Sequence, residues 1–466
     1  MMPNVDACRL APPGDSSTER ASTEATGTEV EIRDDRNDIL PRRQFLAATA
    51  AVSATTIFKG KAFGMQVGSS VTGSVQSDAA ASPNAKSIIG QYGSWVAGLV
   101  EDPPQLSLRR AESPGIDAWR TAARAKTAEL LASPSEVEAA DIQLIRQEQF
   151  EGLDIEHLRW QLPYGRATEA ILLKPQGASG PLPAVLGLHD HGGNKYFGRR
   201  KITRTADPQH PLTVEHQQEY YGGRAWANEL ASRGYVVLVH DAFAFGSRRV
   251  EYQDMSEIPW GPGRTDGQPD NDPESREHIE AYNKWASGHE HVLSKSLFCG
   301  GTTWPGVFLA EDQAALSVLS DRPDVDASRI GCAGLSGGGL RTVMLGGMDE
   351  RVQCAVCVGF MTTWRDFLMN KAFTHTWMTY VPLLPSFLDF PEILGLRAPL
   401  PTMNQSCTED DLYTLPEMQR ADAILQEVFT KVNAPKNYSG KFYPGGHRFD
   451  EAMQADAFAW LDRWLK

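Results

Sequence analysis

The chain has 466 residues, 41% of them hydrophobic and 22% charged, which are the proportions of an ordinary soluble globular protein. The formal net charge is −14 and no basic stretch is interleaved with aromatic residues, which argues against a nucleic-acid partner. The six cysteines, five of them after residue 298, lack the spacing of a disulfide framework.

The N-terminal region has the features of an export signal. Residues 1–40 are polar and charged and are predicted to be disordered. Arg42 and Arg43 are followed by an apolar pair and a weakly apolar run, rich in alanine and threonine, that extends to Phe58. This pattern resembles a twin-arginine signal, and the run is too short to anchor a membrane-spanning helix. We therefore expect residues 1–64 to direct the protein to the twin-arginine export machinery, so that it is periplasmic or secreted without a stable membrane anchor; the alternative is a chance arginine pair in a disordered tail.

The folded body is expected at residues 88–466, after a linker of small residues at 65–87. An extension at 88–163 precedes the core and carries a predicted helix at 117–131. Strands are predicted at 141–151, 153–162 and 167–173, followed by a turn rich in glycine and proline.

Beyond this turn, short apolar strands alternate with helices. Strands are predicted at 184–188, 235–239, 329–335, 352–358, 400–406 and 437–443, and helices at 225–233, 310–319, 337–348, 417–432 and 450–465. Nearly continuous apolar strands separated by helices indicate a largely parallel sheet that is covered on both faces. The predicted class is therefore α/β, with a mostly parallel, doubly wound sheet.

Two long insertions interrupt this alternation of strands and helices. Residues 194–220 and 246–309 are long, polar and irregular, and are expected to form lid-like insertions. The basic run 199–201 in the first insertion is expected to be solvated surface rather than a site for an acidic substrate.

Cys354 and Cys357 form a C-x-x-C pattern on a predicted strand, where positions three apart point to opposite faces. We therefore expect two core residues and neither a disulfide nor a metal site.

The strongest chemical signal is the sequence Gly-Leu-Ser-Gly-Gly at residues 334–338, between a predicted strand and a predicted helix. The pattern G-x-S-x-G in this context is typical of a nucleophile elbow, a tight turn that lifts the serine hydroxyl above the sheet. Small residues on either side let the strand and the helix approach each other. We expect Ser336 to be a nucleophile and the N–H of Gly337 to stabilise an oxyanion; the alternative is a plain glycine-rich turn.

A serine hydroxyl needs a general base, which is expected at His447, in the loop between the last strand and the last helix. The acid that orients the imidazole should lie between the serine and the histidine in the chain. Asp410, just after the penultimate strand, is the prediction. Glu409, Asp411 and, after the preceding strand, Asp366 remain alternatives.

A second oxyanion donor is expected from the loop at residues 189–194, most simply the backbone N–H of His191. An alternative interpretation is a metal site, in which His189 and His191 form a ligand cluster with His240 or Asp241. Further ligands at zinc-like spacing are lacking, so no metal and no cofactor are expected.

With these motifs in hand, residues 164–466 resemble the dienelactone-hydrolase-like, acetyl-xylan-esterase-like branch of the bacterial α/β-hydrolases. The resemblance is carried by residues 183–193, 227–238, 240–248, 320–331 and 443–447. In such enzymes the strand before the acid reads Ala-Pro-Arg-Pro and ends Gly-Thr-Glu-Asp-Pro-Leu-Phe. Here residues 398–401 (Ala-Pro-Leu-Pro) and 407–413 (Cys-Thr-Glu-Asp-Asp-Leu-Tyr) fall in the same register, which carries the role of acid over to Asp410.

Three positions depart from the pattern of this branch. Leu400 replaces an arginine, Cys407 replaces a turn glycine, and Asp190 stands where many relatives have glycine. The last change leaves the oxyanion donor open by one residue. Dienelactone hydrolases proper use a cysteine nucleophile, so Ser336 favours an esterase.

The resemblance implies an α/β-hydrolase fold and hydrolysis of a carboxylic ester through an acyl-enzyme. Acylated carbohydrate is the expected substrate class. Two alternatives stay open: an exported serine peptidase related to prolyl oligopeptidase, and a binding protein that kept the fold. The former usually carries a β-propeller, for which the chain before the core strands leaves no room, and the latter should have lost a member of the serine, acid and histidine set.

Overall fold

The computed structural model describes residues 86–110, 115–255, 257–258, 265, 269–270 and 274–466. The expected export signal at 1–64 and all but the last two residues of the expected linker lie outside these residues. Within the described part, no helix combines the length and the apolar character needed to cross a membrane.

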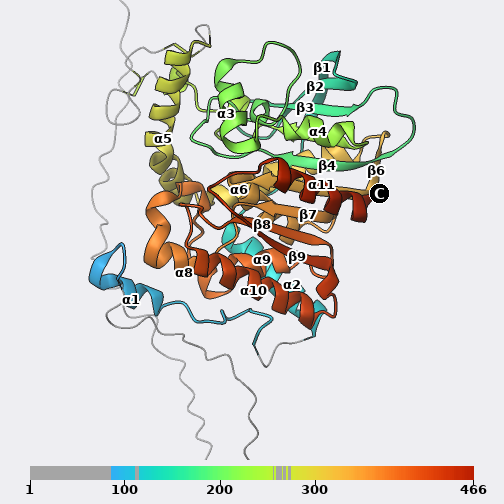
Figure 1. Cartoon of the computed structure of the whole chain (residues 1–466). Helices are drawn as coiled ribbons and strands as arrows, with labels where there is room; N and C mark the ends of the chain where they lie inside the picture. The colour runs from blue at the N-terminus through green and yellow to red at the C-terminus, as the bar shows by residue number, and fades with distance from the viewer. Residues whose placement is uncertain (1–85, 111–114, 256, 259–264, 266–268, 271–273) are drawn as a thin grey trace, which may run out of the picture. The chain divides into compact units, whose positions relative to one another are not determined.

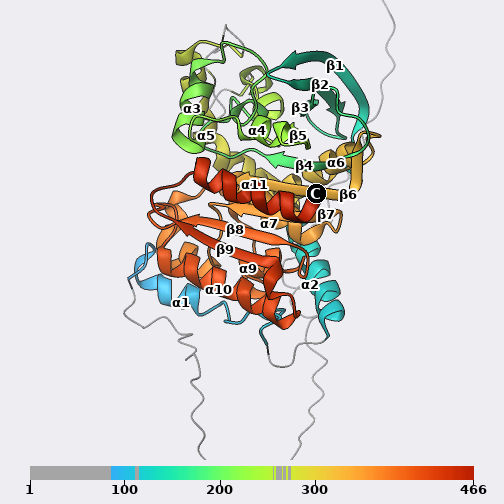
Figure 2. The ribbon, with the colours of Figure 1, turned by 45° about the vertical axis from the view of Figure 1, so that its right-hand side comes forward.

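A nine-stranded sheet with the order β1-β2-β3-β5-β4-β6-β7-β8-β9 forms the centre of the fold (Figures 1 and 2). The strands are β1 (Ala140–Phe150), β2 (Leu153–Gln161), β3 (Thr168–Pro175), β4 (Leu182–Leu188), β5 (Val236–His240), β6 (Val325–Leu335), β7 (Val352–Val358), β8 (Thr402–Cys407) and β9 (Tyr438–Tyr443). The pairs β1–β2, β2–β3 and β3–β5 are antiparallel, and all pairs from β5 to β9 are parallel. The mostly parallel sheet that the sequence predicts is confirmed.

Helices cover both faces of the sheet. The core on one face is shared by α4 (Trp226–Ser232) and α11 (Glu451–Leu465). The core on the other face is shared by α2 (Ile116–Leu131), α6 (Trp304–Ser320), α7 (Gly337–Met348), α9 (Phe390–Gly395) and α10 (Leu415–Lys431). Figure 2 shows α11 crossing the sheet beside β6 and β7.

The two strand cysteines report the same layering. Cys354 and Cys357 are both free and fully buried, and they belong to the cores on opposite faces of the sheet. The prediction that they are separate core residues is confirmed.

The two predicted irregular insertions are wrong in part. The first contains α3 (Pro211–Tyr221) and the second contains α5 (Arg276–Cys299), a helix of 24 residues that is capped by the Ser275 hydroxyl. The buried positions of α5 recur at helical spacing, but several of them are polar, such as His278 and Glu290, so the segment has the overall composition of a polar insertion. A second helical end was also missed, since α6 begins at Trp304 rather than near residue 310.

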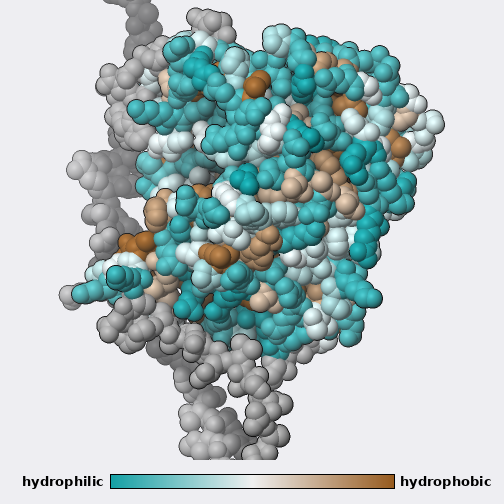
Figure 3. Space-filling view, in the orientation of Figure 1, coloured by the Kyte–Doolittle hydropathy of each residue, from teal (hydrophilic) through white to brown (hydrophobic). Residues whose placement is uncertain are grey.

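A further insertion, which the sequence did not reveal, separates β7 from β8. It comprises α8 (Trp364–Asp366), several short helical turns and α9. Near its start, α1 (Gly93–Ala97) packs beside the turns that follow α8. Figure 3 shows a largely hydrophilic face with several separate brown hydrophobic patches, one of them at the left near α1. Tyr92, Trp95 and Leu99, in and beside α1, are exposed.

Candidate active site

Ser336 occupies a strained turn between β6 and α7. Its backbone angles are φ 59° and ψ −116°, a combination that L-residues seldom adopt. A Cβ atom on Gly334 would lie 2.5 Å from the Leu188 carbonyl oxygen, and one on Gly338 would lie 2.0 Å from the same oxygen. Only glycine fits at both positions, which is the close strand–helix approach expected from the G-x-S-x-G pattern.

His447 lies at the same end of the sheet and is held by Asp410. The Nδ1 atom of His447 is 2.7 Å from Oδ2 of Asp410, whose side chain is 1% exposed. The Nε2 atom of His447 is buried and has no hydrogen-bond partner within the described part of the chain. Ser336 and His447 line one pocket, and because Nδ1 is engaged with the Asp410 carboxylate, Nε2 is the imidazole nitrogen left to act as a base.

The loops that carry Asp410 and His447 are joined through their backbones. The N–H of Thr408 donates to the Tyr443 carbonyl at 2.8 Å, and the N–H of Glu409 donates to the Gly445 carbonyl at 3.0 Å. Cys407, which stands where relatives have a turn glycine, is not among the residues with positive φ, so the loop does not need glycine there. The substitution is therefore compatible with the acid–histidine contact.

The alternative acids have other surroundings. Asp366 accepts hydrogen bonds from the backbone N–H and hydroxyl of Thr414, at 2.8 and 2.9 Å, and from the hydroxyl of Thr362 at 3.0 Å. Glu409 and Asp411 are exposed. Among the four carboxylates considered from the sequence, the structure brings Asp410 to the imidazole.

Two backbone N–H groups lie together beside Ser336. A Cβ atom on Gly337 would lie 3.1 Å from the His191 backbone nitrogen, so the turn after the serine abuts the loop after β4. Among the described residues, neither the Gly337 N–H nor the His191 N–H has an intramolecular acceptor. The pair could therefore donate to an oxygen that carries developing negative charge.

The imidazole of His191 is fixed by its own partners. Its Nδ1 accepts the N–H of Gly193 at 3.0 Å, so the proton is on Nε2, which donates to Glu290 of α5 at 2.7 Å. Lys195 Nζ lies 2.9 Å from the same carboxylate. Burial and the neighbouring Lys195 lower the pKa of His191; against the effect of burial, Lys195 and His191 lower the pKa of Glu290 to about 2.

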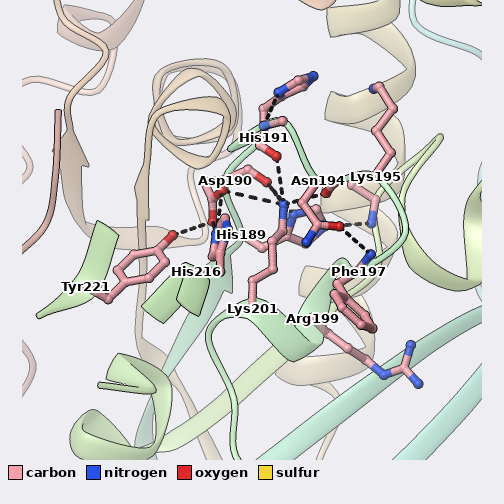
Figure 4. Close-up of polar contacts among 12 residues, drawn as sticks. His189, Asp190, His191, Asn194, Lys195, Phe197, Arg199, Lys201, His216 and Tyr221 are labelled. Carbon is pink, nitrogen blue, oxygen red and sulfur yellow. Dashed lines mark hydrogen bonds and ion pairs between the residues drawn. The ribbon is translucent and has the colours of Figure 1, made fainter. Parts of the chain in front are cut away.

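The basic run at 199–201 is not solvated surface, and that expectation is wrong for two of its three residues. Lys201 is fully buried, and its Nζ donates to the carbonyl oxygens of Asp190, His191 and Asn194 (Figure 4). Arg199 pairs with Asp241 and Glu169. Arg200 is the most exposed of the three, with 37% of its side chain accessible, and it pairs with Glu274 at 2.8 Å.

Asp190, the third departure from the family pattern, is a buried carboxylate. Tyr221 donates to it at 2.5 Å, His216 Nε2 lies 3.0 Å from its Oδ2, and Lys201 Nζ lies 3.5 Å from the same oxygen. Burial opposes ionisation, but His216 and Lys201 hold the pKa of Asp190 well below its usual value. Asp190 is therefore a carboxylate at neutral pH, inside the fold rather than in the pocket.

The pocket has a volume of about 250 Å³ and is lined by residues from the loops after β4, β6, β8 and β9 and from the insertion after β7. The insertion contributes His375, whose Nδ1 lies 3.3 Å from the Lys371 carbonyl oxygen and 2.9 Å from the Thr374 hydroxyl. Burial lowers the pKa of His375 to about 4, so the ring is neutral and Nε2 is an acceptor. His375 Nε2 and the Thr376 hydroxyl are buried and have no partner among the described residues, and both residues line the pocket.

The histidines of the alternative metal cluster are engaged otherwise. His189 Nε2 accepts the N–H of Ala242 at 3.2 Å, and His240 Nε2 lies 2.9 Å from Asp312. Across the described residues no group of three or more His, Cys, Asp or Glu side chains is arranged to hold a metal ion.

Sequence reasoning missed Lys201, Glu290 and His375. Lys201 sits next to two arginines in a polar segment, and nothing local distinguishes a buried lysine there. Glu290 lies on a helix that was not recognised. His375 follows no strand of the sheet, so its place in the pocket depends on how the insertion folds back over Ser336.

No protein-family model matches the chain. Over 327 residues it is 25% identical to "Putative hydrolase YtaP" of Bacillus subtilis (strain 168), which covers 70% of this chain and 92% of that protein.

Two solved structures are similar in fold. One is a "putative acetyl xylan esterase" from Bacteroides fragilis NCTC 9343, with a TM-score of 0.56 and 19% identity over 73% of this chain and 78% of that chain. The other is a glucuronoyl esterase from Solibacter usitatus, with a TM-score of 0.51 and 15% identity over 78% of this chain and 97% of that chain. The predicted α/β-hydrolase fold is confirmed by these likenesses.

Proposed function

We propose that this chain, which has the α/β-hydrolase fold, is a serine hydrolase that cleaves carboxylic esters. The observation that carries the proposal is one pocket that holds a serine on a strained turn and a histidine tied to a buried carboxylate. The Ser336 turn, the 2.7 Å contact between His447 and Asp410, and the unpartnered His447 Nε2 together supply a nucleophile, a base and an orienting acid.

The reaction has two halves. In the first, Ser336 Oγ attacks the ester carbonyl carbon while His447 Nε2 takes the hydroxyl proton, and the carbonyl π electrons move to oxygen. Collapse of this tetrahedral intermediate expels the alcohol, which receives the proton from His447. In the second half, water attacks the acyl-enzyme with His447 again as the base, which releases the acid and restores Ser336.

Asp410 and the two N–H groups stabilise the charges that develop on His447 and on the substrate oxygen. Asp410 keeps the Nδ1 proton of His447 in place, so that Nε2 can accept, and stabilises the imidazolium that forms. The N–H groups of Gly337 and His191, which lie next to the serine and have no acceptor among the described residues, would bind the oxyanion. The steps require no cofactor.

An acylated carbohydrate is the proposed substrate class. Support comes from the names of the two similar structures, a "putative acetyl xylan esterase" and a glucuronoyl esterase. The unpartnered polar atoms of His375 and Thr376 agree with a substrate that carries hydroxyl groups. Export through the twin-arginine route, proposed from Arg42 and Arg43, would place the enzyme where such polymers are found.

A panel of paired substrates tests this function. The purified protein should hydrolyse p-nitrophenyl acetate and acetylated xylo-oligosaccharides, and should leave the matching p-nitroanilides and peptides uncleaved. Ser336→Ala, purified in the same way, is the control for contaminating esterases. Cleavage of peptides without cleavage of esters would favour the peptidase alternative, and a folded protein that cleaves neither would favour a binding protein.

A further inference from the structure

We propose that Lys201 is a positioning residue for the reaction, because its ammonium group orients and polarises the peptide units that donate to the oxyanion. The inference rests on the proposed function, since it concerns how Ser336 chemistry is assisted. It extends that function to a buried cation that touches neither the substrate nor the serine.

The geometry of the loop after β4 carries the inference. Lys201 Nζ donates to the carbonyl oxygen of Asp190, and lies 3.1 Å from that of His191 and 3.2 Å from that of Asn194 (Figure 4). The Asp190 carbonyl belongs to the same peptide unit as the His191 N–H, and the His191 carbonyl to the same unit as the Gly192 N–H. Whether the His191 N–H or the Gly192 N–H donates to the oxyanion, the carbonyl oxygen of the same peptide unit is bound by the Lys201 ammonium group.

A second donor acts on the same peptide unit. His189 Nε2 accepts the N–H of Ala242, so its proton is on Nδ1, which donates to the Asp190 carbonyl at 3.0 Å. Burial holds the pKa of His189 well below its usual value, in agreement with a neutral ring. A carbonyl that accepts two hydrogen bonds, one of them from a cation, withdraws electrons from its amide and makes the N–H a stronger donor.

The buried charge of Lys201 is difficult to explain by a contribution to stability alone. Lys201 is 0% exposed and Asp190 is 1% exposed. Burying such a pair costs several kcal/mol of desolvation per ion, and apolar residues of similar size often replace it without loss of stability. The His191 N–H, in contrast, has no acceptor within the described residues, so a ligand oxygen is the group that would gain from the polarisation.

Several charged groups set the protonation of Lys201. Burial lowers its pKa to about 8, the Asp190 carboxylate opposes this, and the Lys195 ammonium adds to it. Asp241 is the other carboxylate that favours the charged form. The rings of His189 and His191 are neutral, as derived above, and His216 reaches Lys201 only through the Asp190 carboxylate. Lys201 is therefore mainly an ammonium ion at pH 7.

The test compares Lys201→Met with Arg200→Met. The control removes a neighbouring cation that pairs with Glu274 and is 37% exposed along its side chain. In Lys201→Met we expect kcat for p-nitrophenyl acetate to fall by about 10- to 100-fold, less than the 10²–10³-fold loss of a whole oxyanion donor, while KM changes by less than about threefold.

A trifluoromethyl ketone supplies a readout that a merely structural role would not move. Ser336 adds to its carbonyl to give a tetrahedral adduct whose oxyanion occupies the proposed hole. The inhibition constant should rise in Lys201→Met by the same factor by which kcat falls, and should stay unchanged in Arg200→Met. An inhibition constant that does not rise, or a loss of kcat no greater than in the control, would overturn the inference.

A second variant is needed because Lys201→Met leaves the buried Asp190 carboxylate without its cation, which could unfold the protein. Asp190→Asn combined with Lys201→Met removes both charges and keeps side chains that can bond Tyr221 and His216. It should show the same parallel loss in kcat and in ketone binding, and a double variant as active as wild type would refute the proposal. Failure of the proposed function would look different, because the wild-type protein itself would then neither cleave esters nor bind the ketone.

Discussion

Replacement of Asp410 by asparagine should nearly abolish ester hydrolysis while the fold survives. Asp410 uses its two oxygens separately: Oδ1 accepts the N–H of Leu412 at 3.0 Å, and Oδ2 contacts His447 Nδ1 at 2.7 Å. In Asp410→Asn the amide oxygen should stay with the Leu412 N–H, which needs an acceptor, so the NH₂ group turns to the imidazole. His447 must then accept at Nδ1 and carry its proton on Nε2, where it cannot act as a base.

The magnitude follows from the same contact. At an effective dielectric constant of about 20, two unit charges separated by the Nδ1–Oδ2 distance attract each other by about 6 kcal/mol. This is the order of the stabilisation that the imidazolium loses in the transition state. A 10⁴-fold loss of rate, found for the same change in other triads, corresponds to about 5.5 kcal/mol, so we expect kcat to fall by about 10⁴-fold.

The assay is steady-state hydrolysis of p-nitrophenyl acetate at pH 7.5, about one unit above an ordinary histidine pKa. Asp411→Asn is the matched control, since it makes the same change at the next, exposed position. Asp366→Asn tests the remaining alternative and should act on stability through Thr414 rather than on kcat. A loss below tenfold in Asp410→Asn, or a larger loss in either of the other variants, would refute the reasoning.

Further predictions concern export, the turn and the pocket wall. Changing Arg42 and Arg43 to lysine should leave the full-length protein inside the cell, and secretion by a strain without the twin-arginine translocase would contradict the export proposal. Gly338→Ala should cost roughly 1–3 kcal/mol in urea unfolding and most of the activity, because its Cβ would lie 2.0 Å from the Leu188 carbonyl oxygen; unchanged stability would show that the turn can relax. Because burial lowers the pKa of His375 to about 4, the unfolded chain takes up a proton there at a higher pH than the folded protein. Stability that is present above pH 6.5 is therefore lost as the pH falls towards 4, by up to roughly 3 kcal/mol, and the urea midpoint of His375→Gln should fall less over this range than that of wild type.

The core of the fold could be predicted because its signals are local. Strands such as β7 are short apolar runs, and α7 starts directly after the glycine-flanked serine, so both bounds agree with the sequence-based ranges. The Ser, Asp, His order and the position of each residue directly after a strand also predict that Ser336, Asp410 and His447 lie at one end of the sheet. These inferences need only the rule that parallel strands end at the same edge.

The remainder depends on contacts between distant segments. Lys201 is buried because the loop after β4 folds its carbonyl oxygens around the ammonium group. The spacing of residues in the sequence does not predict these hydrogen bonds. The helix that carries Glu290 buries polar side chains, so its sequence resembles a polar insertion although its buried positions recur at helical spacing. His375 reaches the pocket from an insertion without regular periodicity. In each case the partner supplied by tertiary structure, rather than the residue type, decides the environment.

The central claim, that Ser336 is a nucleophile activated by His447, is tested most directly by covalent labelling. A fluorophosphonate probe, followed by digestion and mass spectrometry, should modify the intact protein at Ser336 alone. Labelling should be lost in Ser336→Ala and strongly slowed in His447→Ala, while circular dichroism shows both variants folded. A folded wild-type protein that takes up no label, or one that is labelled at another serine, would contradict the account.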